Sequence, residues 1–462
     1  MAAAVEAYRQ QDYEQARALF LQALERAETF GAADVRLATT LNNLGLAEHA
    51  LGNLPPATAA FQRALAIIEK ALGSEHADVA TIANNLAAAE AEAGRADRAE
   101  ALYRRALAGR EKALGPSHGE VATLLNNLGD FLRKQGRLEE AEPLLRRALA
   151  MREAAFGPSD PRVATLLNNL ALLEQDRGKT GEAEALFRRA LEIQEKNPGA
   201  DGENLATTLN NLGELYRQQR RYALAEPLLR RALGMRERAG RERASRERSS
   251  ELAAALNSLG ILYHEQTRYA EAEALLRRAL ELRASDPHAN PSRLAVSLKV
   301  LAELYQLQGR YNEAEPLLQR ALGVLDAALG PDHPEVASAL QRLAGVHHFQ
   351  RRFAEAEALL LRALAIREKV FGPAHGDLAA TLNNLAELYR TQNQLAKAEP
   401  VYLRLLSLQE RLHGQQHPSV AVTLENLVEL YQATKSAAQA KAMRTHLEEV
   451  RAALASRRPV NP

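Results

Sequence analysis

VATLLNNLGDFLRKQGRLEEAEPLLRRALAMREAAFGPSDP, residues Val121–Pro161, is one unit of a repeat that fills most of the chain. Its paired asparagines mark the phase, because a residue at the first Asn position recurs every 42 residues, with one step of 47 in mid-chain. A fixed period of this length is typical of a solenoid, in which each unit packs on its neighbours. The phase positions are Asn42, Asn84, Asn126, Asn168, Asn210, Asn257, Lys299, Gln341, Asn383 and Glu425.

Within this unit the apolar residues predict two helices. They recur at three- and four-residue steps before and after Gly136-Arg137, which gives each helix one apolar face. Pro143 is expected near the start of the second helix, where its missing N–H costs least. Gly157 is expected to end that helix in a left-handed conformation, and Asp160 is expected to cap the first helix of the next unit.

Two positions keep one residue type in all ten phased units. Ala stands fifteen residues after the phase position, where a small side chain lets two helices approach closely. Leu stands two residues after the phase position and is expected to fill the core. The alanines are Ala57, Ala99, Ala141, Ala183, Ala225, Ala272, Ala314, Ala356, Ala398 and Ala440, and the leucines are Leu44, Leu86, Leu128, Leu170, Leu212, Leu259, Leu301, Leu343, Leu385 and Leu427.

The pattern Leu-x-x-Leu-Gly-x-x-Tyr occurs at Leu209, Leu212, Gly213 and Tyr216 and is followed by Ala225, Leu229 and Ala232. It resembles the tetratricopeptide repeat. The longer period, the NNL core and the loop GPDHPEVA (Gly330–Ala337) resemble the kinesin-light-chain type of that repeat, which is common in bacterial chains. The resemblance implies an all-α fold, a right-handed α-solenoid of about eleven antiparallel helix pairs. The chain departs from the pattern where other residues replace the Tyr, at Glu48, Glu90, Leu132, Glu174 and His347.

The repeats predict one solenoid over residues 1–462, with four irregular parts. Residues 1–30 form an atypical first repeat, either a cap or the start of a fragment of a longer protein. Residues 235–250 are an Arg- and Glu-rich insertion, read either as an overlong helix with a mobile charged loop or as a basic patch for an acidic partner. Residues 436–454 are expected to form a capping helix, and residues 455–462 a disordered tail.

Composition narrows the classes of function. The net charge is +1, aromatic residues make up 5% and Trp is absent, so neither nucleic acid nor an anionic membrane is an expected partner. The chain has no Cys, shows no signal peptide and has no apolar run long enough to span a membrane, so we expect a cytoplasmic protein. No phosphate-binding loop, nucleophile elbow or zinc-protease motif occurs, so we expect no enzyme activity, catalytic residue or cofactor.

The resemblance places the first helix of each pair along a concave groove, and the second Asn of each pair on that side. An amide offers both a donor and an acceptor, so a row of amides suits the backbone of an extended peptide. The alternative is that these amides bond a carbonyl of a neighbouring helix. The row comprises Asn43, Asn85, Asn127, Asn169, Asn211, Asn384 and Asn426, and Ser258, Val300 and Arg342 interrupt it.

Basic residues lie one turn further along the same helices and predict a ligand of mixed or acidic character. The candidate peptide-binding cations are Arg133, Lys134, Arg217 and Arg390, with His264 and His348 in the same row. Acidic neighbours such as Asp130 and Glu387 dilute their charge. The loop histidines His76, His118, His333, His375 and His417 recur in phase, too far apart to share a metal, so no metal site is expected.

Three functions fit these features to different degrees. The first is a non-catalytic scaffold that binds a protein or an extended peptide in its groove. The second, suggested by the shortened first repeat, is a sensor or regulatory arm of a larger signalling system with an NTPase or protease. The third is an enzyme on an α/α toroid, which the small polar groove residues disfavour. The sequence names neither the partner nor the oligomeric state.

Overall fold

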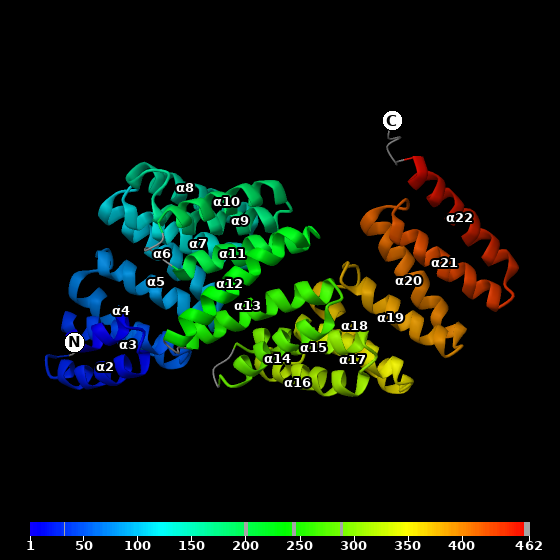
Figure 1. Cartoon of the computed structure of the whole chain (residues 1–462), viewed down its shortest axis with the longest axis horizontal. Coiled ribbons are helices and arrows are strands. Elements are labelled where there is room, and N and C mark those ends of the chain that lie inside the picture. The colour runs from blue at the N-terminus through cyan, green and yellow to red at the C-terminus, as the bar shows by residue number, and fades with distance from the viewer. Residues whose placement is uncertain (32, 198–201, 243–245, 287–289, 457–462) are drawn as a thin grey trace. The chain divides into compact units, whose positions relative to one another are not determined.

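The computed structural model describes residues 1–31, 33–197, 202–242, 246–286 and 290–456. Over these ranges the chain forms 22 helices and no strand, which confirms the predicted all-α solenoid (Figure 1). The helices are α1 (Ala2–Arg9), α2 (Tyr13–Glu28), α3 (Val35–Ala50), α4 (Leu54–Leu72), α5 (Ala77–Glu92), α6 (Ala96–Leu114), α7 (Gly119–Lys134), α8 (Leu138–Phe156), α9 (Pro161–Asp176), α10 (Thr180–Lys196), α11 (Gly202–Gln218), α12 (Tyr222–Glu242), α13 (Arg246–Glu265), α14 (Tyr269–Ala284), α15 (Pro291–Leu307), α16 (Tyr311–Leu329), α17 (Pro334–Phe349), α18 (Phe353–Phe371), α19 (Leu378–Thr391), α20 (Leu395–His413), α21 (Pro418–Ala433) and α22 (Ala437–Ser456).

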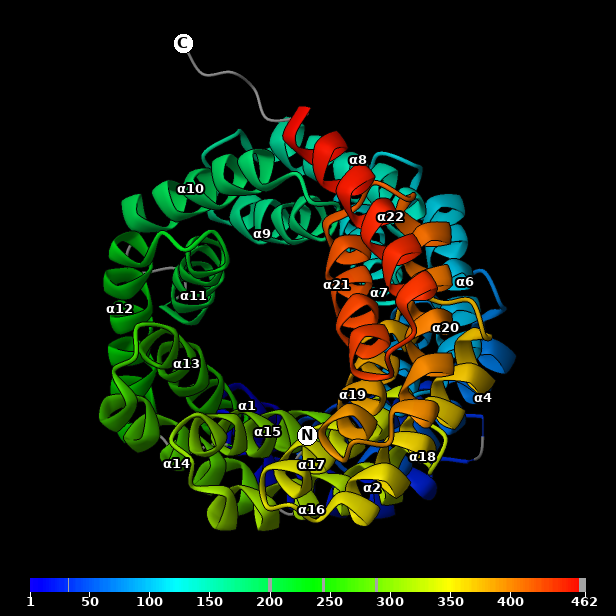
Figure 2. The same ribbon diagram turned by 90° about the vertical axis from the view of Figure 1, so that its right-hand side faces the viewer.

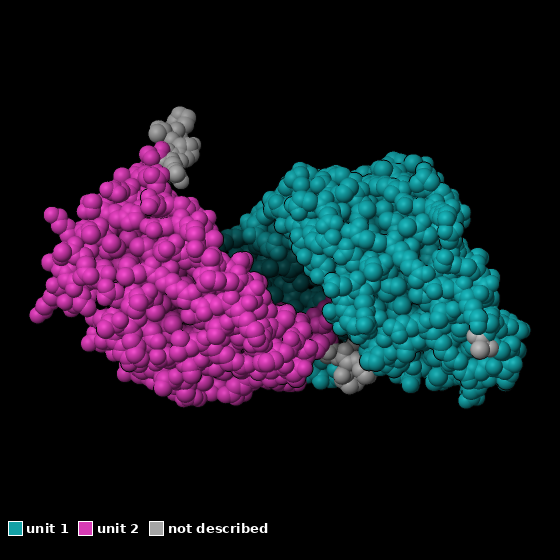
Figure 3. Space-filling view, turned by 180° about the vertical axis from the view of Figure 1, so that it is seen from behind, with its two compact units in different colours: residues 1–288 teal, residues 289–462 magenta. Residues whose placement is uncertain are grey.

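Contacts divide the chain into two units, Met1–His288 and Ala289–Pro462, which Figure 3 colours separately. In each unit the two helices of a repeat pack on each other, and the second helix packs on the first helix of the next repeat. In unit 1 the first helices α9, α11 and α13 lie on the inner side of a curved double layer, with α10 and α12 outside (Figure 2). First helices of successive repeats also contact one another. In unit 1, α7 contacts α9 and α9 contacts α11; in unit 2, α15 contacts α17 and α17 contacts α19.

The predicted helix ends match the structure, with one exception. Gly157 follows α8 with a φ of +84°, and the side chain of Asp160 accepts a hydrogen bond of 2.9 Å from the backbone N–H of Arg162 at the start of α9. The prediction that Pro143 lies near the start of a helix is wrong in detail. Because α8 begins at Leu138, Pro143 lies inside the helix, beyond the first turn, and removes one internal hydrogen bond.

The two invariant positions are both buried. The ten leucines are at most 6% exposed, and nine of the ten alanines are fully buried. Leu128 packs with Tyr103, Phe131 and Leu145 in one cluster that spans consecutive repeats. The invariant leucines and alanines therefore both lie in the core between helices.

The crossing between α7 and α8 depends on a glycine. A Cβ atom built on Gly129 would lie 2.7 Å from Cγ of Leu145, which is itself fully buried. We therefore expect Gly129→Ala to lower the free energy of unfolding by about 1–3 kcal/mol, since the core cannot yield enough space. Gly109→Ala is the matched control: a Cβ atom at this position within α6 meets nothing within 4 Å, so Ala should stabilise the helix by about 0.5–1 kcal/mol. Urea denaturation of both variants tests the opposite signs, and equal effects would contradict this account.

The position where the family pattern has Tyr connects each first helix to the second helix of the preceding repeat. The hydroxyl of Tyr216 donates to Glu184 over 3.0 Å. Glu174, at the same position one repeat earlier, is fully buried and accepts a hydrogen bond of 2.7 Å from Arg146. His347 lies 3.3 Å from Glu315 in the same way. The residues that depart from the pattern thus keep its inter-repeat contact with different chemistry.

A row of ion pairs joins successive second helices on the outer side of each unit. Arg147 lies 2.7 Å from Glu111, and Arg189 lies 2.6 Å from Glu153, each one repeat away. The same pairing recurs for Arg105–Glu69, Arg231–Glu195, Arg278–Glu237, Arg362–Asp326 and Arg404–Glu368. We call these contacts the outer ion-pair row.

The irregular parts of the chain are mostly helical where the structure describes them. The first helix, α1, has only 8 residues, and α12 has 21 and extends into the charged insertion. Arg236 of that insertion contacts Glu251 and Thr207, and Arg248 lies 3.1 Å from Glu203. Residues 243–245 of the insertion and 457–462 of the predicted tail lie outside the described residues, whereas Ala455 and Ser456 belong to α22. None of the described helices combines the length and apolarity that a membrane span requires.

Candidate functional site

Three of the predicted groove asparagines bond to asparagines of the preceding repeat. Nδ2 of Asn127 donates to Oδ1 of Asn84 over 3.0 Å, and the same contact joins Asn85 to Asn42 (3.1 Å) and Asn169 to Asn126 (2.8 Å). The first Asn of one repeat and the second Asn of the next therefore form an amide ladder from α3 to α9. This is the structural role that the sequence left open as an alternative, with a side-chain oxygen in place of a backbone carbonyl.

The amide ladder ends at α9. Asn168 is buried, and its Nδ2 donates to Thr208 on α11, whereas its Oδ1, the atom that would accept from Asn211, forms no hydrogen bond among the described residues. The other asparagines of the row form no side-chain hydrogen bond with the described residues of the protein, and each is half-buried. They are Asn43, Asn211, Asn384 and Asn426. The predicted row is thus divided into a bonded part, Asn85, Asn127 and Asn169, and an open part, Asn43, Asn211, Asn384 and Asn426.

The residues that interrupt the asparagine row between Asn211 and Asn384 form different contacts from the asparagines. Ser258 is buried, and Arg342 forms an ion pair of 2.7 Å with Glu303 on the preceding first helix. Lys299, at the phase position of α15, lies 3.7 Å from Glu335, and burial lowers the pKa of its amine. The inner surface of unit 2 therefore begins with charged pairs where unit 1 has amides.

Each predicted groove cation forms an ion pair within the chain. Arg133 contacts Asp130 (3.0 Å) and Asp176 (2.7 Å), and Arg217 contacts Glu214 (2.8 Å) and Glu265. Burial lowers the pKa of both guanidinium groups, but their two carboxylate partners outweigh this effect and raise it overall. Arg133 and Arg217 thus connect first helices of successive repeats and are only 14% and 16% exposed.

The other two predicted cations are more accessible. Lys134 lies 2.7 Å from Asp130 and is 64% exposed. Arg390 lies 2.7 Å from Glu387 and 3.6 Å from Glu429 and is 41% exposed. Its hydrogen bond with Glu387 raises the pKa of Arg390 above the usual value. The cations of the inner surface are therefore paired with carboxylates, and Lys134 and Arg390, like Arg342 at 41% exposure, remain accessible.

Sequence reasoning missed an exposed aromatic group on unit 2. Phe349 and Leu307 are 62% and 60% exposed at the ends of α17 and α15, and Tyr311 stacks on Phe349 with ring centroids 5.1 Å apart. His348, predicted to lie in the groove, packs edge-on against Phe353 with ring centroids 5.8 Å apart. The sequence does contain a pattern that could have predicted this aromatic group. Among the ten phased repeats, only those of Leu307 and Phe349 have a large apolar residue eight positions after the phase position.

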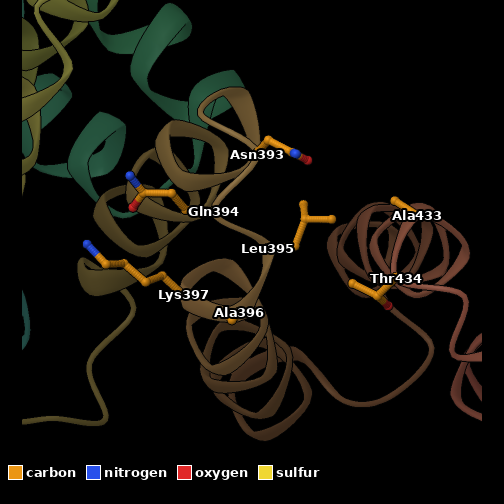
Figure 4. Close-up of a pocket in the computed structure, with 7 residues that line it drawn as sticks. All are labelled: Asn393, Gln394, Leu395, Ala396, Lys397, Ala433 and Thr434. Carbon is orange, nitrogen blue, oxygen red and sulfur yellow. The ribbon is translucent and has the colours of Figure 1, made fainter.

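Two shallow pockets lie where the turns of successive repeats meet. The larger, of about 480 Å³, is lined by residues 393–397 with Ala433 and Thr434. Figure 4 shows Leu395 directed toward Ala433 and Thr434, whereas Gln394 and Lys397 point away. The other, of about 240 Å³, is lined by residues 309–313 and Gln350. Both pockets lie at the ends of first helices, beside the inner surface.

The in-phase loop histidines cap helices. Nδ1 of His76 accepts a hydrogen bond of 3.2 Å from the backbone N–H of Asp78, at the start of α5. The same bond recurs for His118–Glu120, His333–Glu335, His375–Asp377 and His417–Ser419, at 3.2–3.3 Å. Among residues that the structure describes, no group of three or more His, Asp or Glu side chains could hold a metal ion.

Comparison with known proteins agrees with this architecture. A model described as tetratricopeptide repeat matches residues 2–70, 36–112, 78–154, 120–196, 162–238, 293–369, 342–410 and 377–452, and a second model of that description matches residues 252–285. No curated protein sequence matches the chain.

Several solved structures are similar to the chain at low sequence identity. A kinesin-light-chain-type protein with nearly identical TPR-like repeats from Podosopora anserina is 23% identical over 46% of this chain and 98% of its own, with a TM-score of 0.41. The apo form of RapI is 12% identical over 82% of this chain and 99% of its own, with a TM-score of 0.55. A monomeric mutant of IFIT1 with m7Gppp-AAAA is 17% identical over 97% of this chain and 89% of its own, with a TM-score of 0.50.

Proposed function

We propose a function from one premise: the chain belongs to the tetratricopeptide repeat family. Repeats of this family form scaffolds for protein–protein interaction and are typically non-catalytic, because stacked helix pairs expose a long continuous surface. We propose that this chain is such a scaffold and that the inner surface of its first helices binds a protein or an extended peptide.

The observation that carries the proposal is the open part of the asparagine row. Asn384 and Asn426 stand at the same position of two successive repeats, half-buried, with neither donor nor acceptor bonded to the described protein. A half-buried amide without a partner is costly unless water or a ligand satisfies it. An extended peptide presents a donor and an acceptor at every residue, so it complements two such amides without a requirement for particular side chains.

The charge of the inner surface favours a ligand of mixed character over a purely acidic one. Arg133 and Arg217 are each held by two carboxylates, so an acidic ligand would have to compete with both. Lys134 and Arg390 are more accessible than Arg133 and Arg217, and each can contact an acidic side chain while it keeps its own partner. An acidic residue in the ligand is therefore expected opposite Arg390, beside the open amides Asn384 and Asn426.

A capture experiment with paired variants tests the proposal. Partners are captured from native lysate, identified by mass spectrometry, and the recovered binding segment is titrated against Asn384→Ala/Asn426→Ala. Loss of two hydrogen bonds should weaken binding about 5- to 100-fold. Asn85→Ala/Asn127→Ala is the matched control, because these amides bond only within the protein and their loss should alter stability more than affinity. Circular dichroism checks that both variants are equally helical, and equal affinity of wild type and both variants contradicts the proposal.

A further inference from the structure

The strongest repeated polar feature outside the inner surface is the set of histidine caps. Four first helices, α5, α7, α17 and α21, begin with an imidazole whose Nδ1 accepts a backbone N–H, whereas α3 and α9 begin with Asp34 and Asp160 in the same role. Before α19, Nδ1 of His375 accepts the backbone N–H of Asp377, the N-cap residue. An imidazole can accept at Nδ1 only while that nitrogen carries no proton. Imidazole groups commonly change charge between about pH 5 and 8, whereas a carboxylate cap stays ionised over that range.

Four of the five in-phase loop histidines have an acid two residues further on. These acids are Asp78, Glu120, Glu335 and Asp377, and the carboxylates of Asp78 and Asp377 lie 3.6 and 3.7 Å from the imidazoles of His76 and His375. A carboxylate so close can hold a protonated imidazole in place after the cap is lost. At the junctions of His76 and His375 protonation therefore replaces one favourable contact with another.

The junction before α21 lacks this compensation. Ser419 stands where the other four junctions have an acid, and its backbone N–H (3.2 Å) and Oγ (2.8 Å) both contact Nδ1 of His417. The ring of His413, at the end of α20, stacks on His417 with centroids 4.5 Å apart. The junction therefore joins two imidazoles directly, with one of them serving as the cap.

The charged groups around this pair do not offset a second positive charge. On α20, Arg411 is exposed and Glu410 lies 3.7 Å from His446 of α22. On α21, Glu425 is held by Arg451 of α22 over 2.7 Å. In the described part of the chain no carboxylate lies within ion-pair distance of His413 or His417. Protonation of His417 would place a positive charge at the positive end of the α21 dipole, whereas His413 stands at the negative end of the α20 dipole.

From this geometry we propose that the His413–His417 junction is an acid-sensitive latch between the last two repeats. While both rings are unprotonated, the pair stacks and caps α21. Protonation of His417 turns the acceptor into a donor and removes the cap, and protonation of both rings sets them against each other. The first turn of α21 then loosens from α20, while the aspartate-capped α9 is unaffected. The stabilisation is present while Nδ1 of His417 carries no proton and is lost when a fall in pH protonates it.

Amide hydrogen exchange of the full chain at pH 7.5 and 5.5, corrected for the intrinsic rate, tests the latch. We expect the segment that contains the first turn of α21 to lose about five-fold in protection at pH 5.5, the typical effect of one lost helix cap. The first turn of α9, capped by Asp160, serves as the internal reference and should not change. The first turns of α5 and α19, where Asp78 and Asp377 lie beside the caps, should change less than that of α21.

Two variants separate the latch from a general effect of acid. His417→Asp supplies the same cap as Asp160 without an imidazole, so it should abolish the pH-dependent loss in α21. His413→Phe keeps a stacked ring without a charge, so it should reduce the loss while the neutral-pH protection stays. The proposal is overturned if α21 loses no more protection than α9 in the wild type, or if His417→Asp loses as much as the wild type does.

Discussion

Leu128→Ala is expected to lower the free energy of unfolding by roughly 2–5 kcal/mol. Leu128 is 1% exposed and packs between two repeats against Tyr103 and Leu145, so its removal leaves a cavity that the helix crossing at Gly129 cannot close. Urea denaturation followed by circular dichroism measures the change. Because solenoid units can unfold separately, hydrogen exchange of α7 and α8 should show where stability is lost.

The control for this prediction is a leucine of the same unit outside the core. Leu224 is 43% exposed, so Leu224→Ala should change stability by less than about 1 kcal/mol. Similar losses from the two variants would mean that the invariant leucines do not form the core that the contacts describe.

Glu174→Ala is expected to destabilise the fourth and fifth repeats by about 1.5–3 kcal/mol, the usual effect of losing hydrogen bonds to a charged group. Glu174 is fully buried and lies 2.7 Å from Arg146, 3.5 Å from Arg177 and 3.6 Å from Lys179. These cations are partly exposed and can turn to water, which places the expected loss below that of a fully buried ion pair.

Glu174→Tyr separates the role of this position from its charge. One repeat later Tyr216 occupies the position and its hydroxyl donates to Glu184, and Arg188 donates to the same hydroxyl over 3.0 Å. Glu142 and Arg146 are the equivalent residues around Glu174, so Tyr should recover at least half of the stability lost in Glu174→Ala. Thermal denaturation of the two variants makes the comparison, and a Tyr variant as unstable as the Ala variant would show that only a carboxylate fits.

The repeat period accounts for how much of the fold could be predicted. Helix positions, the buried alanines and leucines, and the caps at Gly157 and Asp160 all follow from local pattern, because each depends on residues a few positions apart. The placement of Pro143 was less accurate, since a helix boundary depends on where the preceding turn closes. Capping by the loop histidines was missed because His is not a usual cap residue.

The candidate site was predicted less completely, for a different physical reason. The bond of Asn127 with Asn84, and that of Arg133 with Asp176, each join residues 43 positions apart. Such pairs depend on the rotation between successive repeats, which the period alone does not specify. The sequence therefore places these residues on the first helices but cannot tell an amide bonded to its neighbour from one that is open to a ligand.

The two kinds of contact between repeats in unit 1 give its two layers different mechanical properties. The amide ladder on the inner side is uncharged, so neither salt nor moderate acid weakens it. The outer ion-pair row, as in Arg147–Glu111 and Arg189–Glu153, consists of partly exposed charges that dissolved ions screen. Between α3 and α9 we therefore expect high ionic strength to loosen the contacts between second helices more than the amide ladder between first helices. From α11 to α13 the inner contact is the ion pair Arg217–Glu265, so salt should weaken both layers there.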